Sequence, residues 1–277
     1  MPHVTVGQEN NQDIQLYFED HGQGEPVVLI HGYPLNGHSW ERQEAALLDA
    51  GYRVITYDRR GFGASSQPSA GYDYDTFAAD LDALLRHLDL TGVTLAGFSM
   101  GGGEVARYIG KYGESRIKKA VFASPVAPYL VKTSDNPEGV DKSVFDGIMD
   151  QIRKDRFAFF KGFFENFYNA DVFRGSRVSD DVLHQSFMVA ASASARATLA
   201  CVPAWLEDFR PDVAKITVPT LIVQGDQDRI VPMEASGGRL PKLIAGSEMV
   251  VIKDGPHAIS WTHADELNAA LLAFLRK

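Results

Sequence analysis

Short apolar runs alternate with longer segments of helical periodicity through most of this 277-residue chain. The short runs are rich in β-branched residues, which favours strands. The expected strands are Gln15–Glu19, Val27–Ile30, Arg53–Tyr57, Val93–Ala96, Lys119–Ala123, Thr220–Gln224 and Glu248–Ile252. Several of them are apolar throughout, which is typical of strands buried on both faces of a mostly parallel sheet.

Helical spacing appears between the expected strands. Apolar residues from Phe77 to Leu88 recur with helical spacing, and Asp73 precedes them as a candidate N-cap. A second helix is expected over residues 101–112. A last helix is expected to start at Thr262 with a variant of the capping box. Strands that alternate with helices predict an α/β fold, in which helices flank a central sheet.

The alternation stops between about Val126 and Val218. This stretch has no clear strand and is rich in phenylalanine, and prolines stand at its entry and exit. We interpret it as a helical insertion. The chain is thereby divided into a core of residues 1–125 and 219–277 and a cap of residues 126–218.

Charge and composition narrow the range of partners. The net charge is −9, whereas nucleic acids and anionic membranes attract basic patches, so neither is an expected partner. The N-terminus lacks the basic and apolar regions of a signal peptide, and no apolar run is long enough to span a membrane. The single cysteine, Cys201, cannot form an internal disulfide, which favours a reducing compartment. A cytoplasmic location is therefore expected.

The strongest chemical signal follows the strand Val93–Ala96. Residues Gly97–Gly101 read GFSMG, a G-x-S-x-G motif at a strand-to-helix junction. In a nucleophile elbow, such a serine lies on a sharp turn with its hydroxyl exposed above the sheet. Glycine-rich turns also carry serines for structural reasons, so the motif needs support from the rest of the chain. Ser99 is the candidate covalent nucleophile.

A serine nucleophile needs a base, and the base needs an orienting carboxylate. In elbow enzymes these residues occur in the order Ser, Asp or Glu, His. The loop after the strand Thr220–Gln224 offers two acids, of which Asp228 is preferred because it lies further into the loop and Asp226 is typical of a turn cap. His257 follows a Gly-Pro turn after the last strand and is the candidate base, with a surface-turn histidine as the alternative interpretation. His263 is the weaker candidate.

An oxyanion hole requires two N–H donors. One is expected from Met100, directly after the nucleophile, and the second from Tyr33 in the loop after Val27–Ile30, since Pro34 has no N–H. Apolar side chains are expected to form the pocket walls, which suits a small uncharged substrate. These walls are Tyr33, Phe98, Met100, Trp205 and Ile230. Core packing is the equal alternative for Trp205.

Four segments occur together: HGYP at residues 31–34, DRRGFGASS at 58–66, GFSMGGGE at 97–104 and GDQD at 225–228. Together they resemble the α/β-hydrolase fold enzymes called cofactor-free, or non-haem, haloperoxidases, a group that also holds aryl esterases, perhydrolases and γ-lactamases. The similarity covers nearly the whole chain. Further segments, at residues 72–77, 135–139 and 205–210, look most like the γ-lactamase members.

The resemblance implies a serine hydrolase that acts on small esters or lactams through an acyl-enzyme. It implies the roles assigned above, with Ser99 as the nucleophile, His257 as the base and Asp228 as the orienting carboxylate. Tyr33 and Met100 are again the amide donors. It also implies that hydrogen peroxide can capture an acyl group derived from a carboxylic acid, so that halide oxidation needs no haem, metal or other cofactor. C-x-x-C-H and H-E-x-x-H motifs are absent from the sequence.

The resemblance further implies a helical cap over the site and a homo-oligomer. Other chemistry stays open on the same fold. A carbon–carbon bond hydrolase or a lyase would keep the three residues, and a ligand-binding receptor could keep them for slow turnover.

Overall fold

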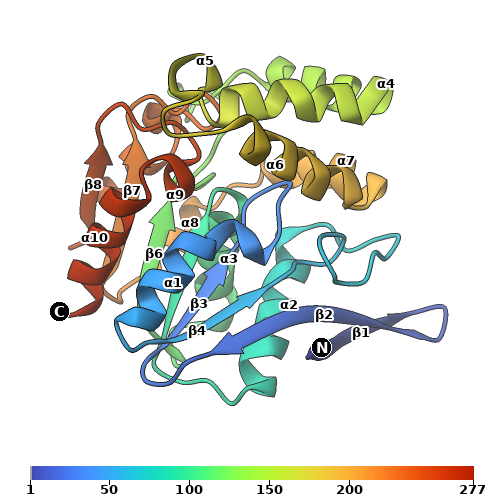
Figure 1. The fold of residues 1–277 in the computed structure, drawn as a ribbon. Helices are drawn as coiled ribbons and strands as arrows, with labels where there is room; N and C mark the ends of the chain where they lie inside the picture. Colours follow the sequence, from blue (N-terminus) through green and yellow to red (C-terminus); the bar gives the residue numbers. More distant parts are fainter. Residues whose placement is uncertain (1) are drawn as a thin grey trace.

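The computed structural model describes residues 2–277 and is built around an eight-stranded sheet (Figure 1). In sheet order the strands are β1 (His3–Glu9), β2 (Gln12–His21), β4 (Arg53–Tyr57), β3 (Pro26–Ile30), β5 (Val93–Phe98), β6 (Ile117–Ala123), β7 (Thr220–Gly225) and β8 (Glu248–Ile252). Neighbours from β4 to β8 pair in parallel, whereas the β1–β2 and β2–β4 pairs are antiparallel.

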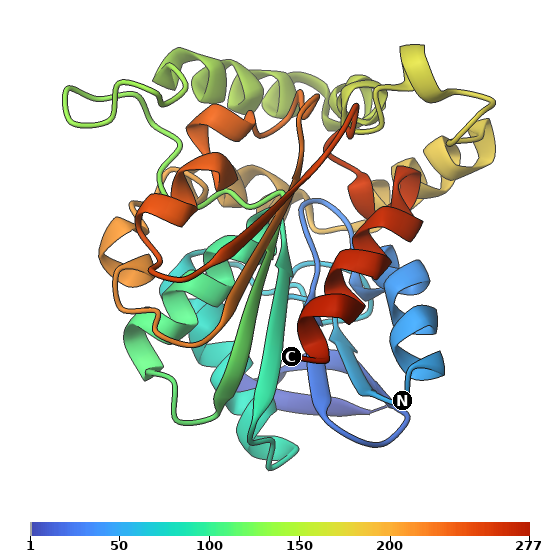
Figure 2. The same cartoon turned by 90° about the vertical axis from the view of Figure 1, so that its left-hand side faces the viewer.

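The central strands are apolar because both of their faces are covered. Every residue of β5 and of β7 is buried. Helices α1 (Glu41–Asp49) and α10 (Ala264–Leu275) lie on one face of the sheet, and α2 (Tyr74–His87) and α3 (Met100–Tyr112) lie on the other (Figure 2). The predicted α/β architecture with a mostly parallel sheet is confirmed.

The edge strand β1 was not predicted from the sequence. Its residues are only partly buried, so they do not form the continuous apolar run of the inner strands. A turn joins it to β2 at Asn10 and Asn11, which have φ angles of 50° and 62°. Two consecutive positive φ angles are the signature of a tight hairpin turn, and asparagine tolerates them better than most residues. The Asn-Asn pair was the available signal.

Of two helix starts that were predicted from the sequence, one agrees with the structure and the other does not. The Asp73 carboxylate accepts a hydrogen bond from the Thr76 N–H at 2.8 Å and caps α2 as predicted. Near the C-terminus, a short helix α9 (Ile259–Thr262) precedes α10, and His263 separates them. The Thr262 hydroxyl donates to the Ala258 carbonyl at 3.0 Å instead of capping α10. The expected helix start at Thr262 was therefore wrong.

Between β6 and β7 the described chain forms helices and no strand of the sheet. They are α4 (Lys142–Phe167), α5 (Ala170–Phe173), α6 (Asp180–Ser192), α7 (Ala195–Ala204) and α8 (Arg210–Val213). Helices α4 to α7 lie over the carboxyl ends of the parallel strands (Figure 1). Phenylalanines of α4 are buried, among them Phe160, Phe164 and Phe167, so this layer has an aromatic core of its own.

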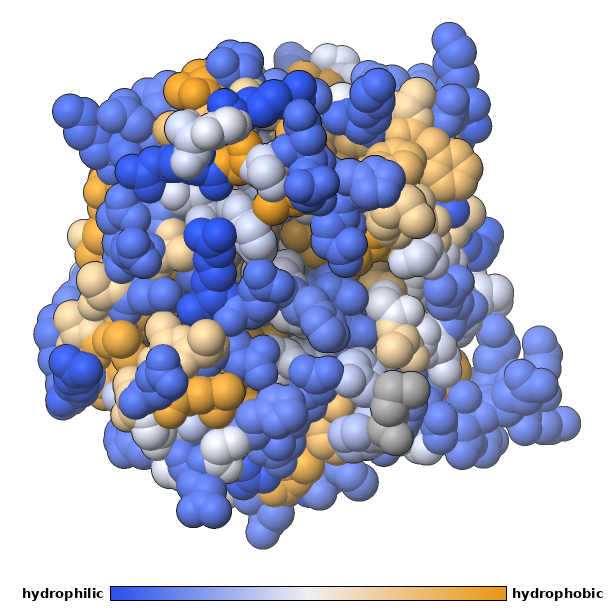
Figure 3. Space-filling view, viewed as in Figure 1, coloured by the Kyte–Doolittle hydropathy of each residue, from blue (hydrophilic) through white to orange (hydrophobic). Residues whose placement is uncertain are grey.

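Apolar side chains on the surface are dispersed. On the face drawn in Figure 3 they form small groups separated by hydrophilic residues. Within residues 2–277, no single helix has both the length and the apolar character needed to cross a membrane. Only α6 and α7 taken together reach that length and composition, and they are bent by 95° relative to each other.

A buried ion pair fixes the loop after β4 against α3. Arg59 Nη2 lies 2.7 Å from Glu104 Oε2, and both side chains are almost completely buried. The Tyr57 hydroxyl donates to the other carboxylate oxygen, and Arg59 Nη2 also donates to the His31 carbonyl at 3.0 Å. The pair therefore ties the ends of β3 and β4 to the helix that follows Ser99.

Replacement of Glu104 by glutamine is expected to lower the free energy of unfolding by about 3 kcal/mol, because Arg59 would remain charged and buried without a countercharge. Urea denaturation measures this change. The matched control is Glu234→Gln at an exposed position, for which less than about 0.5 kcal/mol is expected. Equal denaturation midpoints for the two variants would contradict the prediction.

Candidate active site

Ser99 occupies a strained turn between β5 and α3. Its φ and ψ angles are 53° and −115°, a region that residues with a side chain rarely adopt. Such a conformation persists only where its surroundings enforce it. Here the Ser99 N–H donates to the Ala123 carbonyl at 2.8 Å, and the Ser99 carbonyl accepts from the Gly102 N–H at 2.9 Å.

The two glycines of the motif are needed because backbone segments approach them closely. A Cβ atom on Gly97 would lie 2.3 Å from the Gly101 carbonyl oxygen, and one on Gly101 would lie 2.4 Å from the Ile30 carbonyl oxygen. Both neighbours are main-chain atoms, which cannot rotate away as a flexible side chain would. The G-x-S-x-G pattern is thus a packing requirement of this turn.

Ser99, His257 and Asp228 form a continuous hydrogen-bonded chain. His257 Nε2 lies 2.8 Å from Ser99 Oγ, and His257 Nδ1 lies 2.7 Å from Asp228 Oδ2. All three residues are buried. They follow β5, β8 and β7 respectively, so the parallel sheet brings them together at the edge where these strands end.

The Asp228 carboxylate is held in a fixed orientation. Its Oδ1 atom accepts from the Ile230 and Val231 N–H groups at 2.9 and 2.8 Å. Because an ionised carboxylate only accepts hydrogen bonds, His257 Nδ1 must carry the proton, and Nε2 is left to accept from the Ser99 hydroxyl. Asp226 is exposed to solvent, and no hydrogen bond joins it to His257.

The Phe98 side chain differs from its expected position. Its ring is not among the residues that line the cavity at Ser99. It packs instead against the His257 imidazole, with centroids 5.0 Å apart, and Phe167 contacts the same imidazole at 5.1 Å. Phe98 is the last residue of β5 and directly precedes Ser99. It packs behind the histidine instead of lining the pocket.

Two backbone amides near Ser99 are available as donors. Met100 is the first residue of α3, and Tyr33 follows the turn after β3. Among residues 2–277, neither N–H donates to a protein acceptor. The first N–H groups of a helix lack partners within the helix, and its dipole is positive at this end. This arrangement can stabilise a negative charge that develops beside Ser99.

Ser99 opens into a small cavity of about 40 Å³. Apart from Ser99, the residues that line it have aliphatic or aromatic side chains. The lining residues are Tyr33, Ser99, Val126, Leu130, Phe145, Phe163, Trp205, Ile230 and Val231. Trp205 and Ile230 were expected here. No sequence pattern distinguishes Val126, Leu130, Phe145 or Phe163 from the many other apolar residues of 126–218.

Of the polar side-chain atoms of Tyr33 and Trp205, the first has a hydrogen-bond partner and the second has none among the described residues. The Tyr33 hydroxyl donates to the Thr198 carbonyl at 2.9 Å, and the Tyr33 and Trp205 rings pack edge to face with centroids 4.7 Å apart. The Trp205 Nε1–H is buried and has no hydrogen-bond partner among the described residues.

Comparison with known proteins decides the family. A model described as "alpha/beta hydrolase fold" matches residues 25–264. The chain belongs to the α/β-hydrolase fold family. A relative from Synechocystis sp. named "Putative non-heme chloroperoxidase" is 62% identical over the full length of both chains. The relative named "Bifunctional esterase/perhydrolase DCH" from Acinetobacter calcoaceticus is 35% identical over 95% of this chain and 96% of its own.

The solved structures agree with this assignment. The crystal structure of bromoperoxidase from Bacillus anthracis is 50% identical in sequence and superimposes with a TM-score of 0.96, which covers 100% of this chain and 99% of that one. The predicted membership in the haloperoxidase, esterase and perhydrolase group of the α/β hydrolases is thereby confirmed. Nothing in these comparisons distinguishes the γ-lactamase members.

This α/β hydrolase also has a larger groove of about 490 Å³ between α6, α9 and the loop after β3. Ser99 and His257 are not among its lining residues. Phe167 lines the groove and contacts the His257 ring, so one aromatic side chain separates the groove from the hydrogen-bonded chain. Ser99 therefore lines the smaller cavity and not this groove.

Two other reactive side chains of the hydrolase are structural. Burial raises the pKa of the Cys201 thiol to about 12, so it stays protonated and is a poor nucleophile. Burial also holds the pKa of His31 well below its usual range. The neutral His31 ring accepts from the Arg59 N–H at Nε2 and contacts the Gly32 carbonyl through Nδ1. It thereby supports the loop that carries Tyr33.

Proposed function

We propose that this protein is a serine hydrolase that cleaves small esters or lactams through an acyl-enzyme on Ser99. The single observation that carries the proposal is the hydrogen-bonded chain from Ser99 through His257 to Asp228, at 2.8 and 2.7 Å. A hydroxyl, an imidazole and a carboxylate in this order form the constellation that activates a serine. The esterase and perhydrolase relative supports the same reaction class.

In the proposed mechanism, Ser99 Oγ attacks the substrate carbonyl while His257 Nε2 takes the hydroxyl proton. The oxyanion that forms is stabilised by the N–H groups of Tyr33 and Met100. Collapse of the tetrahedral intermediate breaks the bond to the leaving group, which receives the proton from His257. Water then attacks the acyl-enzyme, with His257 again as the base, and releases the carboxylic acid.

Hydrogen peroxide can replace water in the last step. The acyl group then leaves as a peracid, which oxidises halide without a metal centre. The relatives with haloperoxidase and perhydrolase names support this second activity. The cavity at Ser99 is small and apolar, so we propose uncharged substrates with short acyl groups.

We further propose that residues 126–218 act as a cap over the site, because they supply most of the cavity lining. Cytoplasmic location and assembly into a homo-oligomer stay predictions from the sequence.

The proposal is tested with p-nitrophenyl acetate hydrolysis and with peracid formation from acetate and hydrogen peroxide. Wild-type protein is expected to catalyse both reactions, and a fluorophosphonate probe is expected to block both. Turnover that resists the probe would contradict an acyl-enzyme on Ser99. Labelling by the probe without either activity would favour a carbon–carbon hydrolase or a lyase, and absence of labelling would favour a binding protein.

A further inference from the structure

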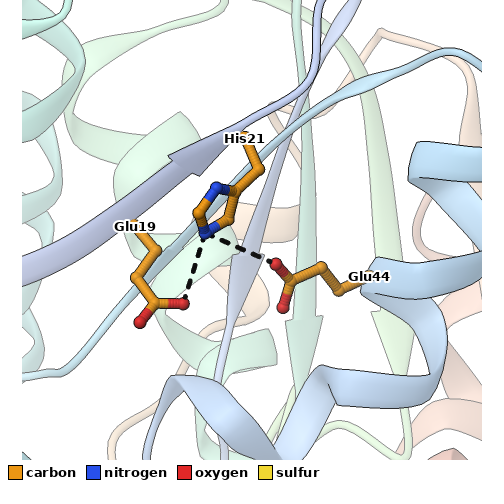
Figure 4. Close-up of side chains that lie close together, drawn as sticks. All are labelled: Glu19, His21 and Glu44. Atoms are coloured by element: carbon orange, nitrogen blue, oxygen red, sulfur yellow. Dashed lines mark ion pairs between the residues drawn. The ribbon is translucent and has the colours of Figure 1, made fainter.

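Three metal-ligating side chains meet between β2 and α1, outside the cavity at Ser99. Glu19 and His21 are two positions apart on β2 and so lie on the same face of the strand. Glu44 projects toward them from α1 (Figure 4). His21 Nε2 lies 3.6 Å from Glu19 Oε2 and 3.9 Å from Glu44 Oε1. One ligand atom from each residue lies within 4.8 Å of the other two.

We propose that Glu19, His21 and Glu44 bind a zinc ion. Tetrahedral zinc with bonds of about 2.0–2.1 Å separates neighbouring ligand atoms by about 3.3–3.4 Å. The observed separations of 3.6 and 3.9 Å need only small side-chain movements to reach this value. Two carboxylates and a neutral imidazole also carry a total charge that balances a divalent cation.

The donor set favours zinc over the hard cations. Mg²⁺ and Ca²⁺ prefer ligand sets made entirely of oxygen, whereas imidazole suits zinc and its neighbours among the transition metals. Water is the expected fourth ligand. His38 offers a further nitrogen nearby, because its Nε2 atom lies 3.7 Å from Glu19 Oε1.

The surroundings of Glu19 resemble the outer shell of a metal site. The Tyr17 hydroxyl donates to Glu19 Oε1, which leaves Oε2 to face His21. Hydrogen bonds of this kind orient ligating carboxylates in metalloproteins. The Glu19 and Glu44 side chains are 24% and 19% exposed, while His21 is 51% exposed, so the ligands are partly held in place and an ion can still enter from solvent.

Bound zinc would cross-link the N-terminal hairpin to α1. The ligands come from two separate elements and form no local motif, so this cluster has no signal in the sequence. The ordinary alternative is that a protonated His21 pairs with the two carboxylates and that no ion binds. This inference does not depend on the chemistry of Ser99.

The test is a calorimetric titration of the untagged, full-length protein with zinc chloride, together with thermal unfolding. Wild-type protein is expected to bind one zinc ion at this site, and its melting temperature is expected to rise by a few degrees at about 100 times the dissociation constant. His21→Ala and Glu44→Gln are each expected to weaken this binding at least about tenfold. The matched control is His184→Ala, which removes an exposed histidine on α6.

The outcomes separate zinc binding from simple ion pairing. Loss of the zinc-dependent stabilisation in both variants, with the control unchanged, would support the site. Zinc binding that is absent in wild type, or that both variants retain, would overturn the proposal. Each variant without zinc should keep its hydrolytic activity, which verifies that it is folded.

Discussion

Replacement of Ser99 by alanine is expected to lower kcat for p-nitrophenyl acetate hydrolysis by about 10⁵-fold or more. The substitution removes the hydroxyl that we propose forms the acyl-enzyme. The fold should be unaffected, because alanine keeps the Cβ atom and the Ser99 hydroxyl bonds only to His257. Initial rates measure the activity, and thermal unfolding measures the stability.

A matched control separates the loss of a nucleophile from the loss of any serine. Ser192 is exposed at the end of α6, and its hydroxyl donates only to the Val189 carbonyl. Ser192→Ala should hydrolyse the ester at the wild-type rate and react with a fluorophosphonate probe. Residual acyl transfer of more than a few per cent in Ser99→Ala would assign the nucleophile to another residue.

Replacement of Asp228 by asparagine is expected to lower kcat by about 10⁴-fold with little change in substrate binding. The asparagine oxygen can still accept from the Ile230 and Val231 N–H groups. Its amide nitrogen would then face His257 Nδ1. A donor at that position forces the imidazole proton onto Nε2, so the ring can no longer accept the proton of Ser99.

The neighbouring acid supplies the control for this prediction. Asp226 belongs to the same loop but is exposed, and Asp226→Asn should change kcat by less than about twofold. Steady-state kinetics of both variants test the assignment. A larger loss in Asp226→Asn than in Asp228→Asn would mean that the orienting carboxylate had been chosen wrongly.

The sequence predicts those features of the fold that follow a repeated pattern of apolar residues or a strict local requirement for one residue type. Inner strands such as β3 are apolar at every position, and the Ser99 turn requires glycine at residues 97 and 101 because backbone atoms lie close by. The order of Ser99, Asp228 and His257 follows from where parallel strands end. The apolar runs and the glycine turn can be predicted from neighbouring residues, and the three site residues from their positions after parallel strands.

Other parts of the structure depend on contacts between segments that are far apart in the sequence, so no local sequence pattern predicts them. Phe163 lines the cavity while Phe164, the next residue, is buried in the packing of α4 and does not line it. Both are phenylalanines in one helix, and only the path of that helix over the sheet decides between them. The cluster of Glu19, His21 and Glu44 likewise exists only because β2 and α1 lie side by side.

Most of the residues that line the cavity at Ser99 come from a different stretch of chain than Ser99, His257 and Asp228. Ser99, His257 and Asp228 follow strands of the sheet, whereas Val126, Leu130, Phe145, Phe163 and Trp205 come from the segment between β6 and β7. Mutations in that segment can therefore change the size or shape of the cavity while the hydrogen bonds between Ser99, His257 and Asp228 keep their geometry. In evolution, the same division lets a lineage acquire new substrates in small steps without passing through an inactive ancestor.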